Sequence, residues 1–511
     1  MQFALLALPL TMLAFGLADV NRATVAKQRL QDALDAATLM AARSTATTDQ
    51  GLSAVAQPAL VTNLSNLTGG TLTGSSFHLN GAYIDSTATV SMTPIISNLW
   101  MSGNMNITAT SEVVRTMNNL EVALVLDNTG SMSSSLGSGG SKISALQTAS
   151  QNLVNTLYAA AANSTDPNAV KMAVVPFSHT VNVGSTYQNA SWMASGQPSA
   201  YGTDIFSTAG SNRFTFLSNM GLTWAGCVEA RKAPYDVQDT TPSSGNGATM
   251  VVPYFAPDEP DSNKISNGYG GYVSYGNNWI TNDKTSSTTA WTRLAYVSKY
   301  AASNKSNLAS GASGTGNFGP NRECGLTSLL RLTTSQSTVN SKLQSMVAQG
   351  NTNIAMGLQW GWFAISPNGP FKDGVAYGTA HTDKIIVLLT DGDNTNDTTG
   401  NSSPMNSIYT GLGYISQGRL LDANGNVVPD SSNGTTRRDA IDSRELLLCS
   451  NMKAQNIIIY TIGVGVSSHS QGVLQQCASG TDHYYDVTDS SQLTSVFNAI
   501  AGSIENLRIS R

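Results

Sequence analysis

Three oxygen-bearing side chains follow a short apolar run at alternate positions. Residues 122–126 lead into Asp127, and Thr129 and Ser131 follow at intervals of two residues. An apolar run of this length that ends in a turn signal is typical of a buried strand. Ligands of open α/β sheets bind beyond the carboxyl ends of such strands. One carboxylate and two hydroxyls without a nearby histidine make a poor nucleophilic triad, but they suit a hard divalent cation.

This D-x-T-x-S run resembles the metal-ion-dependent adhesion site (MIDAS) of von Willebrand factor A domains, whose usual form is D-x-S-x-S. In that family a threonine on a second loop and an aspartate on a third loop complete the site. Two later stretches match in the expected order. Residues 350–353 precede a helical pattern, and residues 384–392 form an apolar run that contains an aspartate near its end. The resemblance therefore implies Thr352 and Asp391 as the fourth and fifth ligands.

We expect these ligands to bind Mg²⁺ in different ways. Thr129 and Ser131 would bind it through their hydroxyls, Thr352 directly or through water, and Asp127 and Asp391 through water, since magnesium keeps several waters in protein sites. Neutral hydroxyls leave the ion under-neutralised, so it would take an acidic oxygen from a protein partner. Ca²⁺ and Mn²⁺ stay open as alternatives. The competing interpretation gives Asp127 a helix-capping role and treats the threonine match as chance.

The elements that must position these residues form an α/β pattern over residues 119–511. Strands are predicted at 122–126, 172–177, 384–390, 456–463 and 483–487, and helices at 142–157, 335–348, 354–365, 437–454, near 473–478 and at 490–504. This alternation predicts a doubly wound, mostly parallel sheet with helices on both faces, as in von Willebrand factor A domains. Two polar stretches without periodicity, 179–325 and 393–436, are expected to be insertions.

The first 44 residues predict a membrane helix that continues as an amphipathic helix. Residues 1–18 carry no charged side chain and approach the length that spans a bilayer. A signal peptide is the alternative, but the run lacks a basic start and a small-residue cleavage site. Residues 19–43 continue the helical pattern. This arrangement resembles the N-terminus of TadE/TadG-like Tad (Flp) pilus-assembly proteins, which in turn resembles the first helix of a pilin.

Two further parts of the chain complete the expected organisation. Residues 45–118 are expected to form a polar linker, up to about residue 74, and then a small β unit with two alternating runs. Residues 224–231 and 253–261 of the long insertion are similar to stretches of TadG-like proteins, so the resemblance covers nearly the whole chain. The acidic residues of the second stretch are interpreted as an exposed rigid turn, with calcium binding as the alternative.

Composition and cysteine placement restrict the compartment and the partners. Only 12% of the 511 residues are charged and the net charge is -5, which argues against a nucleic-acid partner. The four cysteines pair most simply as Cys227 with Cys324 and Cys449 with Cys477. Two disulfides in an oxidising compartment are therefore expected. Four buried thiols remain the alternative, because spacing does not fix connectivity.

These features together predict a binding protein and not an enzyme. The expectation is a single-pass inner-membrane protein, with the bulk of the chain periplasmic or at the cell surface, that binds partners through a divalent cation in Tad pilus assembly or surface attachment. One alternative is a structural, minor pilin-like subunit with a non-essential metal site. A remote alternative is a magnesium-dependent aspartyl-phosphate enzyme, because residues 127–131 look like the D-K-T-G-T motif of P-type ATPases. Asn128 replaces the lysine of that motif.

Overall fold

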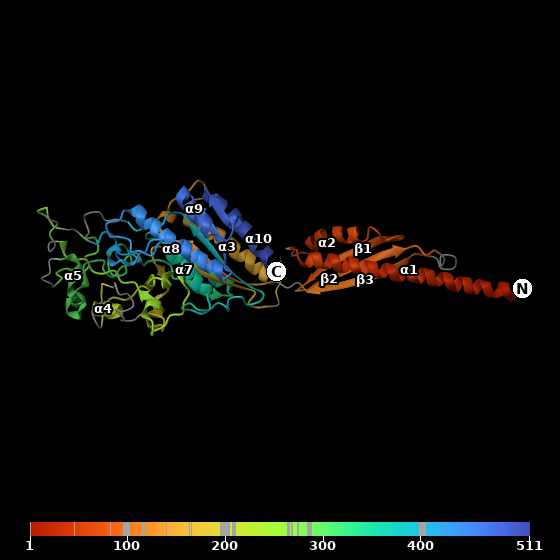
Figure 1. Ribbon diagram of the computed structural model, residues 1–511, viewed down its shortest axis with the longest axis horizontal. Helices are drawn as coiled ribbons and strands as arrows, with labels where there is room; N and C mark the ends of the chain where they lie inside the picture. Colours follow the sequence, from red (N-terminus) through yellow and green to blue (C-terminus); the bar gives the residue numbers. More distant parts are fainter. Residues whose placement is uncertain are drawn as a thin grey trace. The chain divides into compact units, whose positions relative to one another are not determined.

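The computed structural model divides the chain into two compact units (Figure 1). The first comprises residues 1–119, 157–169 and 501–511, and the second comprises residues 120–156 and 170–500. The structure describes residues 2–510 except positions 45, 47, 82, 139, 163 and 165 and the segments 96–102, 115–117, 195–204, 207–210, 263–265, 267–268, 273–274, 284–288 and 398–404. The side chains of residues 2–16 and 506–510 are also outside the description. Each unit is considered by itself below.

The first unit packs two helices on a small antiparallel sheet. Its elements are α1 (Gln2–Ala42), α2 (Asp49–Asn63), β1 (Gly70–Asn80), β2 (Tyr83–Met92) and β3 (Met105–Val114), with sheet order β1-β2-β3. Buried and half-buried residues alternate along most of β2, as expected for a sheet with one face on the core. Leu30 and Leu34 of α1 are fully buried in this core. The small β unit predicted from the sequence is therefore present.

Helix α2 corrects the expectation of a linker up to about residue 74. Thr48 caps the helix by accepting a hydrogen bond from the Gly51 backbone amide at 3.1 Å. Leu52, Ala56 and Leu60, one turn apart, are completely buried. Pro58 inside the helix argues against a helix on sequence grounds, but tertiary packing on α1 and β1 makes the segment helical.

The expected membrane span falls largely on side chains that the structure does not describe. From Gln2 onward, the backbone of this stretch is part of α1. Among the residues that are described, no helix has a stretch long and apolar enough to cross a membrane.

The second unit is built on a mixed sheet with the order β12-β11-β10-β4-β5-β6-β7-β8, to which β9 is added by pairing with β5. Parallel pairs join β4 to β5, β10 to β11 and β11 to β12. The strands in these pairs are β4 (Asn119–Asp127), β5 (Val170–Phe177), β10 (Thr382–Thr390), β11 (Ile458–Val464) and β12 (Tyr484–Val487). All but the first residue of β4 are buried, as is typical of strands covered on both faces. The α/β class expected from the sequence is therefore present.

The mostly parallel sheet expected from the sequence is instead mixed. Antiparallel pairing brings in four short strands, which are β6 (Val181–Asn182), β7 (Cys227–Glu229), β8 (Val252–Pro253) and β9 (Leu330–Thr333). Three of the four lie in the stretch 179–325, so the insertion extends the sheet beyond β5 and does not only loop out from it. Strands of two or three residues have no alternation that a sequence pattern could reveal.

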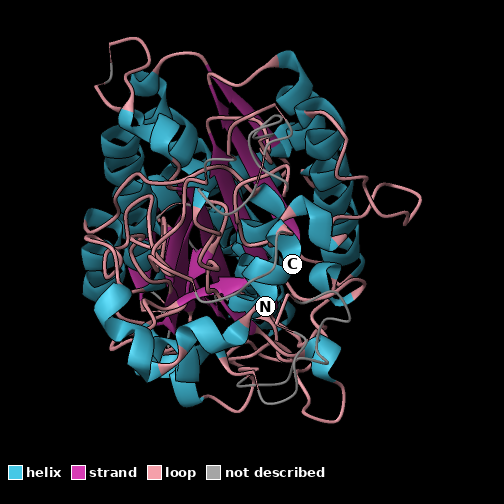
Figure 2. Cartoon of the chain, turned by 90° about the vertical axis from the view of Figure 1, so that its left-hand side faces the viewer, coloured by secondary structure: helices cyan, strands magenta, loops and turns pink. Residues whose placement is uncertain are grey.

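The helices agree closely with those expected from the sequence. The long ones are α3 (Lys142–Ala161), α6 (Gln336–Gln344), α7 (Ile354–Ile365), α8 (Gly434–Ala454), α9 (Ser468–Cys477) and α10 (Leu493–Ser510). The insertion adds the short helices α4 (Arg213–Asn219) and α5 (Ala290–Ala295). In the view of Figure 2, strands run through the middle and helices are seen on either side.

Two glycines let α7 lie close against the central strands. A side-chain carbon on Gly357 would overlap the ring of Phe177 in β5, and one on Gly361 would overlap Val125 Cγ2 in β4. Asn353 caps α7 by accepting a hydrogen bond from the Met356 amide at 3.0 Å. Close packing and the cap together fix the start of α7, and the preceding loop carries Thr352.

Both disulfides expected from the sequence are present. Cys227 pairs with Cys324 at a Cα–Cα distance of 5.9 Å, and Cys449 pairs with Cys477 at 5.2 Å. The first bridge ties β7 to the end of the long insertion. The second ties α8 to the end of α9.

The acidic stretch of the insertion is buried and not an exposed turn. Asp258 lies 3.2 Å from the buried ammonium of Lys299 and accepts hydrogen bonds from the Trp279 and Ile280 amides. Glu259 accepts from the Asn277 amide at 2.6 Å. These carboxylates hold distant parts of the insertion together.

Candidate metal site

The five residues expected to bind a cation lie on three loops at the carboxyl ends of β4 and β10 and before α7. Asp127 is the last residue of β4, and Asp391 directly follows β10. The loop after β4 contacts the loop before α7, because the Gly130 amide donates to the Gly350 carbonyl at 2.9 Å. Adjacent strands that end at the same edge of the sheet therefore gather residues far apart in the chain.

A chain of hydrogen bonds connects four of the five residues. Thr129 donates its amide to Asp127 Oδ1 at 2.7 Å, and its hydroxyl lies 3.0 Å from Ser131 Oγ. Ser131 Oγ in turn donates to Asp391 Oδ1 at 2.6 Å. The two hydroxyls of the motif therefore lie next to each other, and that of Ser131 contacts the second aspartate.

Thr352 lies at the same edge through its contact with the loop after β10. A side-chain carbon on Gly392 would lie 4.0 Å from Thr352 Oγ1. The Thr352 carbonyl accepts a hydrogen bond from the Thr395 amide at 2.9 Å. Thr352 is buried. All three expected loops therefore meet at one place.

Two residues that the sequence analysis did not assign also belong to this arrangement. Thr390 Oγ1 donates to Asp127 Oδ2 at 2.7 Å, and Lys142 Nζ donates to Asp391 Oδ2 at 2.8 Å. Thr390 precedes Asp391 at the strand end, which is a signal that could have been used. Lys142 is the first residue of α3, and nothing in the neighbouring sequence distinguishes it from a lysine that faces solvent.

Burial and negative charge determine the acidity of Asp127. Burial raises the pKa of this completely buried carboxyl to about 6, and the negative charge of Asp391 adds to the increase. Hydrogen bonds from Thr129 and Thr390 act in the opposite direction. Two neighbouring buried carboxyls make this edge of the sheet favourable for positive charge.

The donors are of the kind that a hard divalent cation requires. Three hydroxyls and two carboxylates supply only oxygen, the element that Mg²⁺ and Ca²⁺ prefer. Lys142 already places an ammonium on one of the carboxylates. The residues therefore fit a magnesium-type ion, with Lys142 as a competing positive charge.

The comparisons with known proteins connect the chain with pilus proteins. Residues 3–44 match the family model described as putative Flp pilus-assembly TadE/G-like, which confirms the resemblance expected for the N-terminal helix. No curated protein matches the chain in sequence.

Among the solved structures that match the chain at low identity are three pilus proteins. The pilus adhesin SpaC of Lactobacillus rhamnosus GG is 13% identical with a TM-score of 0.34, and the match covers 86% of this chain but 35% of SpaC. The von Willebrand factor domain of the pilus tip protein Mfa5 of Porphyromonas gingivalis is 11% identical with a TM-score of 0.34, covering 77% of this chain and 97% of Mfa5's. The minor pilin PilB of Streptococcus sanguinis is 12% identical with a TM-score of 0.34, covering 86% of this chain and 79% of PilB's. The chain thus spans about a third of SpaC.

Proposed function

We propose that the second unit is a cation-dependent binding module of a pilus-associated envelope protein. Asp127, Thr129, Ser131, Thr352 and Asp391 would hold Mg²⁺, with Ca²⁺ or Mn²⁺ as alternatives. The observation that carries this proposal is the convergence of three hydroxyls with two buried carboxylates at the edge of the sheet. A buried pair of like charges is costly unless a positive charge accompanies it.

The bound ion would supply an attachment point for an acidic group. Because hydroxyl ligands leave a divalent cation under-neutralised, an open position favours a carboxylate from another protein. The partner is proposed to be a component of the pilus machinery or a molecule on a surface. The match of residues 3–44 with a pilus-assembly family supports the first possibility and a location in the cell envelope. The apolar residues 1–18 are proposed to anchor the chain in the inner membrane.

A second candidate function is supported by the first unit. A 41-residue helix packed on an antiparallel sheet would suit a minor pilin-like subunit that assembles through its N-terminal helix. In that case the metal site would not be needed for assembly.

An attachment assay separates the two functions. Cells that produce the parent chain or the Asp127→Ala variant are compared for pilus assembly and surface attachment, with and without a chelator. The binding function predicts that the variant and the chelator each reduce attachment to the same level, and that the chelator has no further effect on the variant. Normal assembly and attachment by the variant would instead support the structural subunit.

A further inference from the structure

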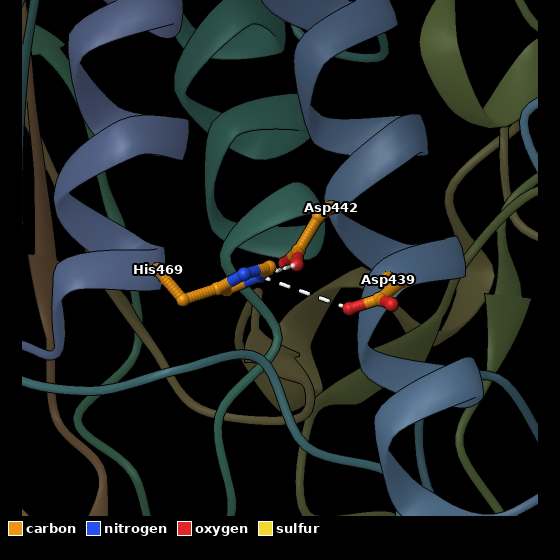
Figure 3. A group of neighbouring side chains, drawn as sticks. All are labelled: Asp439, Asp442 and His469. Carbon is orange, nitrogen blue, oxygen red and sulfur yellow. Dashed lines mark hydrogen bonds and ion pairs between the residues drawn. The ribbon is translucent and has the colours of Figure 1, made fainter.

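Helices α8 and α9 bring two aspartates and a histidine together (Figure 3). Asp439 and Asp442 lie on α8, and His469 lies in the first turn of α9. His469 Nε2 is 2.7 Å from Asp442 Oδ2 and 3.8 Å from Asp439 Oδ1. One donor atom from each residue lies within 4.8 Å of the others. None of these residues belongs to the site at the end of β4.

The spacing of the three donors is close to that around a single metal ion. Ligand atoms lie about 2.0–2.2 Å from zinc, so two donors in a tetrahedral shell are about 3.4 Å apart. The two histidine–carboxylate distances lie on either side of that value. Asp439 is 54% exposed, whereas Asp442 is buried and held by Asn394.

Covalent and hydrogen-bonded supports hold the two helices and the central ligand. Asp442 precedes Cys449 by two helical turns on the same face of α8, and the Cys449–Cys477 disulfide joins α8 to α9. Asn394 Nδ2 donates to Asp442 Oδ1 at 2.8 Å, which leaves Oδ2 directed to His469. A hydrogen bond from a neighbouring amide to a metal-binding carboxylate fixes the orientation of that carboxylate.

A buried carboxyl with one unpartnered oxygen lies next to Asp442. The same Asn394 amide also donates to Glu445 Oε2 at 2.7 Å, so the carboxyls of Asp442 and Glu445 converge on one amide. Glu445 is completely buried, and its Oε1 has no hydrogen-bond partner among the described residues. Buried polar atoms are rarely left unpaired without a reason.

Among the described contacts, the guanidinium of Arg438 is the one positively charged side chain close enough to compete strongly with a metal ion for these carboxylates. Its Nη2 lies 2.8 Å from Asp439 Oδ1, and its Nε lies 3.9 Å from Asp442 Oδ2. An ion would have to take Asp439 Oδ1 from the guanidinium. Arg438 is half-buried, with 23% of its side chain accessible, so the guanidinium would have to turn outward into solvent when an ion binds.

We propose that Asp439, Asp442 and His469 form a second metal site, which binds a borderline divalent ion of the zinc class. One imidazole nitrogen with two carboxylate oxygens is a donor set that suits zinc, whereas magnesium and calcium prefer oxygen alone. Three protein ligands leave a fourth position for water or for a group of another molecule. The two sites of the domain would therefore select different ions.

Two other histidine–aspartate pairs of the chain provide matched controls. His483 Nδ1 lies 2.7 Å from Asp482 Oδ1, and His78 Nδ1 lies 2.7 Å from Asp49 Oδ2. Among the described residues, only the α8–α9 cluster adds a third ligand of this kind. A pair alone should bind zinc weakly.

The test is titration of the full chain with Zn²⁺ by calorimetry, repeated with Co²⁺ by visible absorption, in the presence of excess Mg²⁺. The proposal predicts one saturable zinc equivalent and cobalt bands typical of a low-coordinate site. His469→Gln and Asp442→Asn should each weaken binding at least about tenfold, which corresponds to about 1.4 kcal/mol. Arg438→Gln should tighten it, and His483→Gln should leave it unchanged.

Three results would overturn the proposal, and circular dichroism first establishes that each variant is folded. The first is the absence of saturable zinc binding in the parent chain. The second is an equal loss of zinc affinity in His469→Gln and His483→Gln. The third is loss of zinc binding in the Asp127→Ala, Ser131→Ala double variant. The last result would assign the zinc to the first site. Magnesium binding by the parent chain is a separate measurement, so failure of one site is distinguishable from failure of the other.

Discussion

Lys142 Nζ lies 2.8 Å from Asp391 Oδ2, so the second aspartate of the candidate metal site already has a positively charged partner. Both side chains are largely buried, with 11% and 0% of their surfaces exposed. An ion pair in such a place is poorly screened by solvent. A bound cation must therefore share Asp391 with the lysine or displace it.

Replacing Lys142 by methionine should change metal affinity and stability in opposite directions. Mg²⁺ should bind on the order of tenfold more tightly, because a nearby positive charge no longer repels it. The metal-free variant should be less stable, since Asp391 loses its partner. Calorimetric titration and thermal melts measure the two effects. Lys142→Arg keeps the charge and serves as the control, and an unchanged affinity in Lys142→Met would exclude competition.

The stabilisation by Mg²⁺ should depend on pH. The pKa of Asp127 is raised to about 6, so the folded chain binds a proton more strongly than the unfolded chain between about pH 4 and 6. The metal-free fold is therefore expected to gain stability from this residue as the pH falls through that range. Because Mg²⁺ competes with this proton, its effect on the melting temperature should be larger at about pH 7.5 than at about pH 5. Asp127→Asn should abolish the difference, and a pH-independent shift would contradict this assignment.

The closeness of α7 to the central strands can be tested at Gly361. A methyl group there would overlap Val125, so Gly361→Ala should lower the free energy of unfolding by about 1–3 kcal/mol. Gly472 in α9 faces open space, so Gly472→Ala should instead be neutral or stabilise by up to about 1 kcal/mol. Chemical denaturation measures both. Equal effects would show that α7 is not held as described.

The disulfide between α8 and α9 should contribute to stability without being part of the magnesium site. Removing it with the Cys449→Ala, Cys477→Ala double variant should cost about 2–4 kcal/mol of unfolding free energy. Magnesium affinity at about room temperature should stay within twofold of the parent value, because no hydrogen bond of the described residues joins either cysteine to the loops at Asp127 or Asp391. A large loss of magnesium affinity in the folded variant would indicate that the two regions are coupled.

The sequence allowed the central strands and the converging site residues to be predicted because both leave strong local signals. The buried run before Asp127 and the run before Asp391 are long, apolar and end in an acidic residue. In contrast, β6 and β8 have only two residues each, and α2 contains a proline, Pro58, in its interior. Their formation depends on contacts with distant parts of the chain.

Side chains that complete the two sites were harder to predict for a related reason. Lys142 begins a helix like many solvated lysines, and only the fold shows that it contacts Asp391. Asp442 and His469 lie on separate helices without a recognisable spacing, so their proximity depends on how α8 packs on α9. Sequence patterns within a single helix do not show which other helix it will pack against.

The proposed function depends on divalent-cation binding by five residues, which are Asp127, Thr129, Ser131, Thr352 and Asp391. Its most direct test is calorimetric titration of Mg²⁺ into the full chain beside the Asp127→Ala, Ser131→Ala double variant, with both proteins shown to be folded. The predicted result is saturable binding by the parent chain that is absent from the variant. Indistinguishable titrations would contradict the claim and leave a structural pilus subunit as the better explanation.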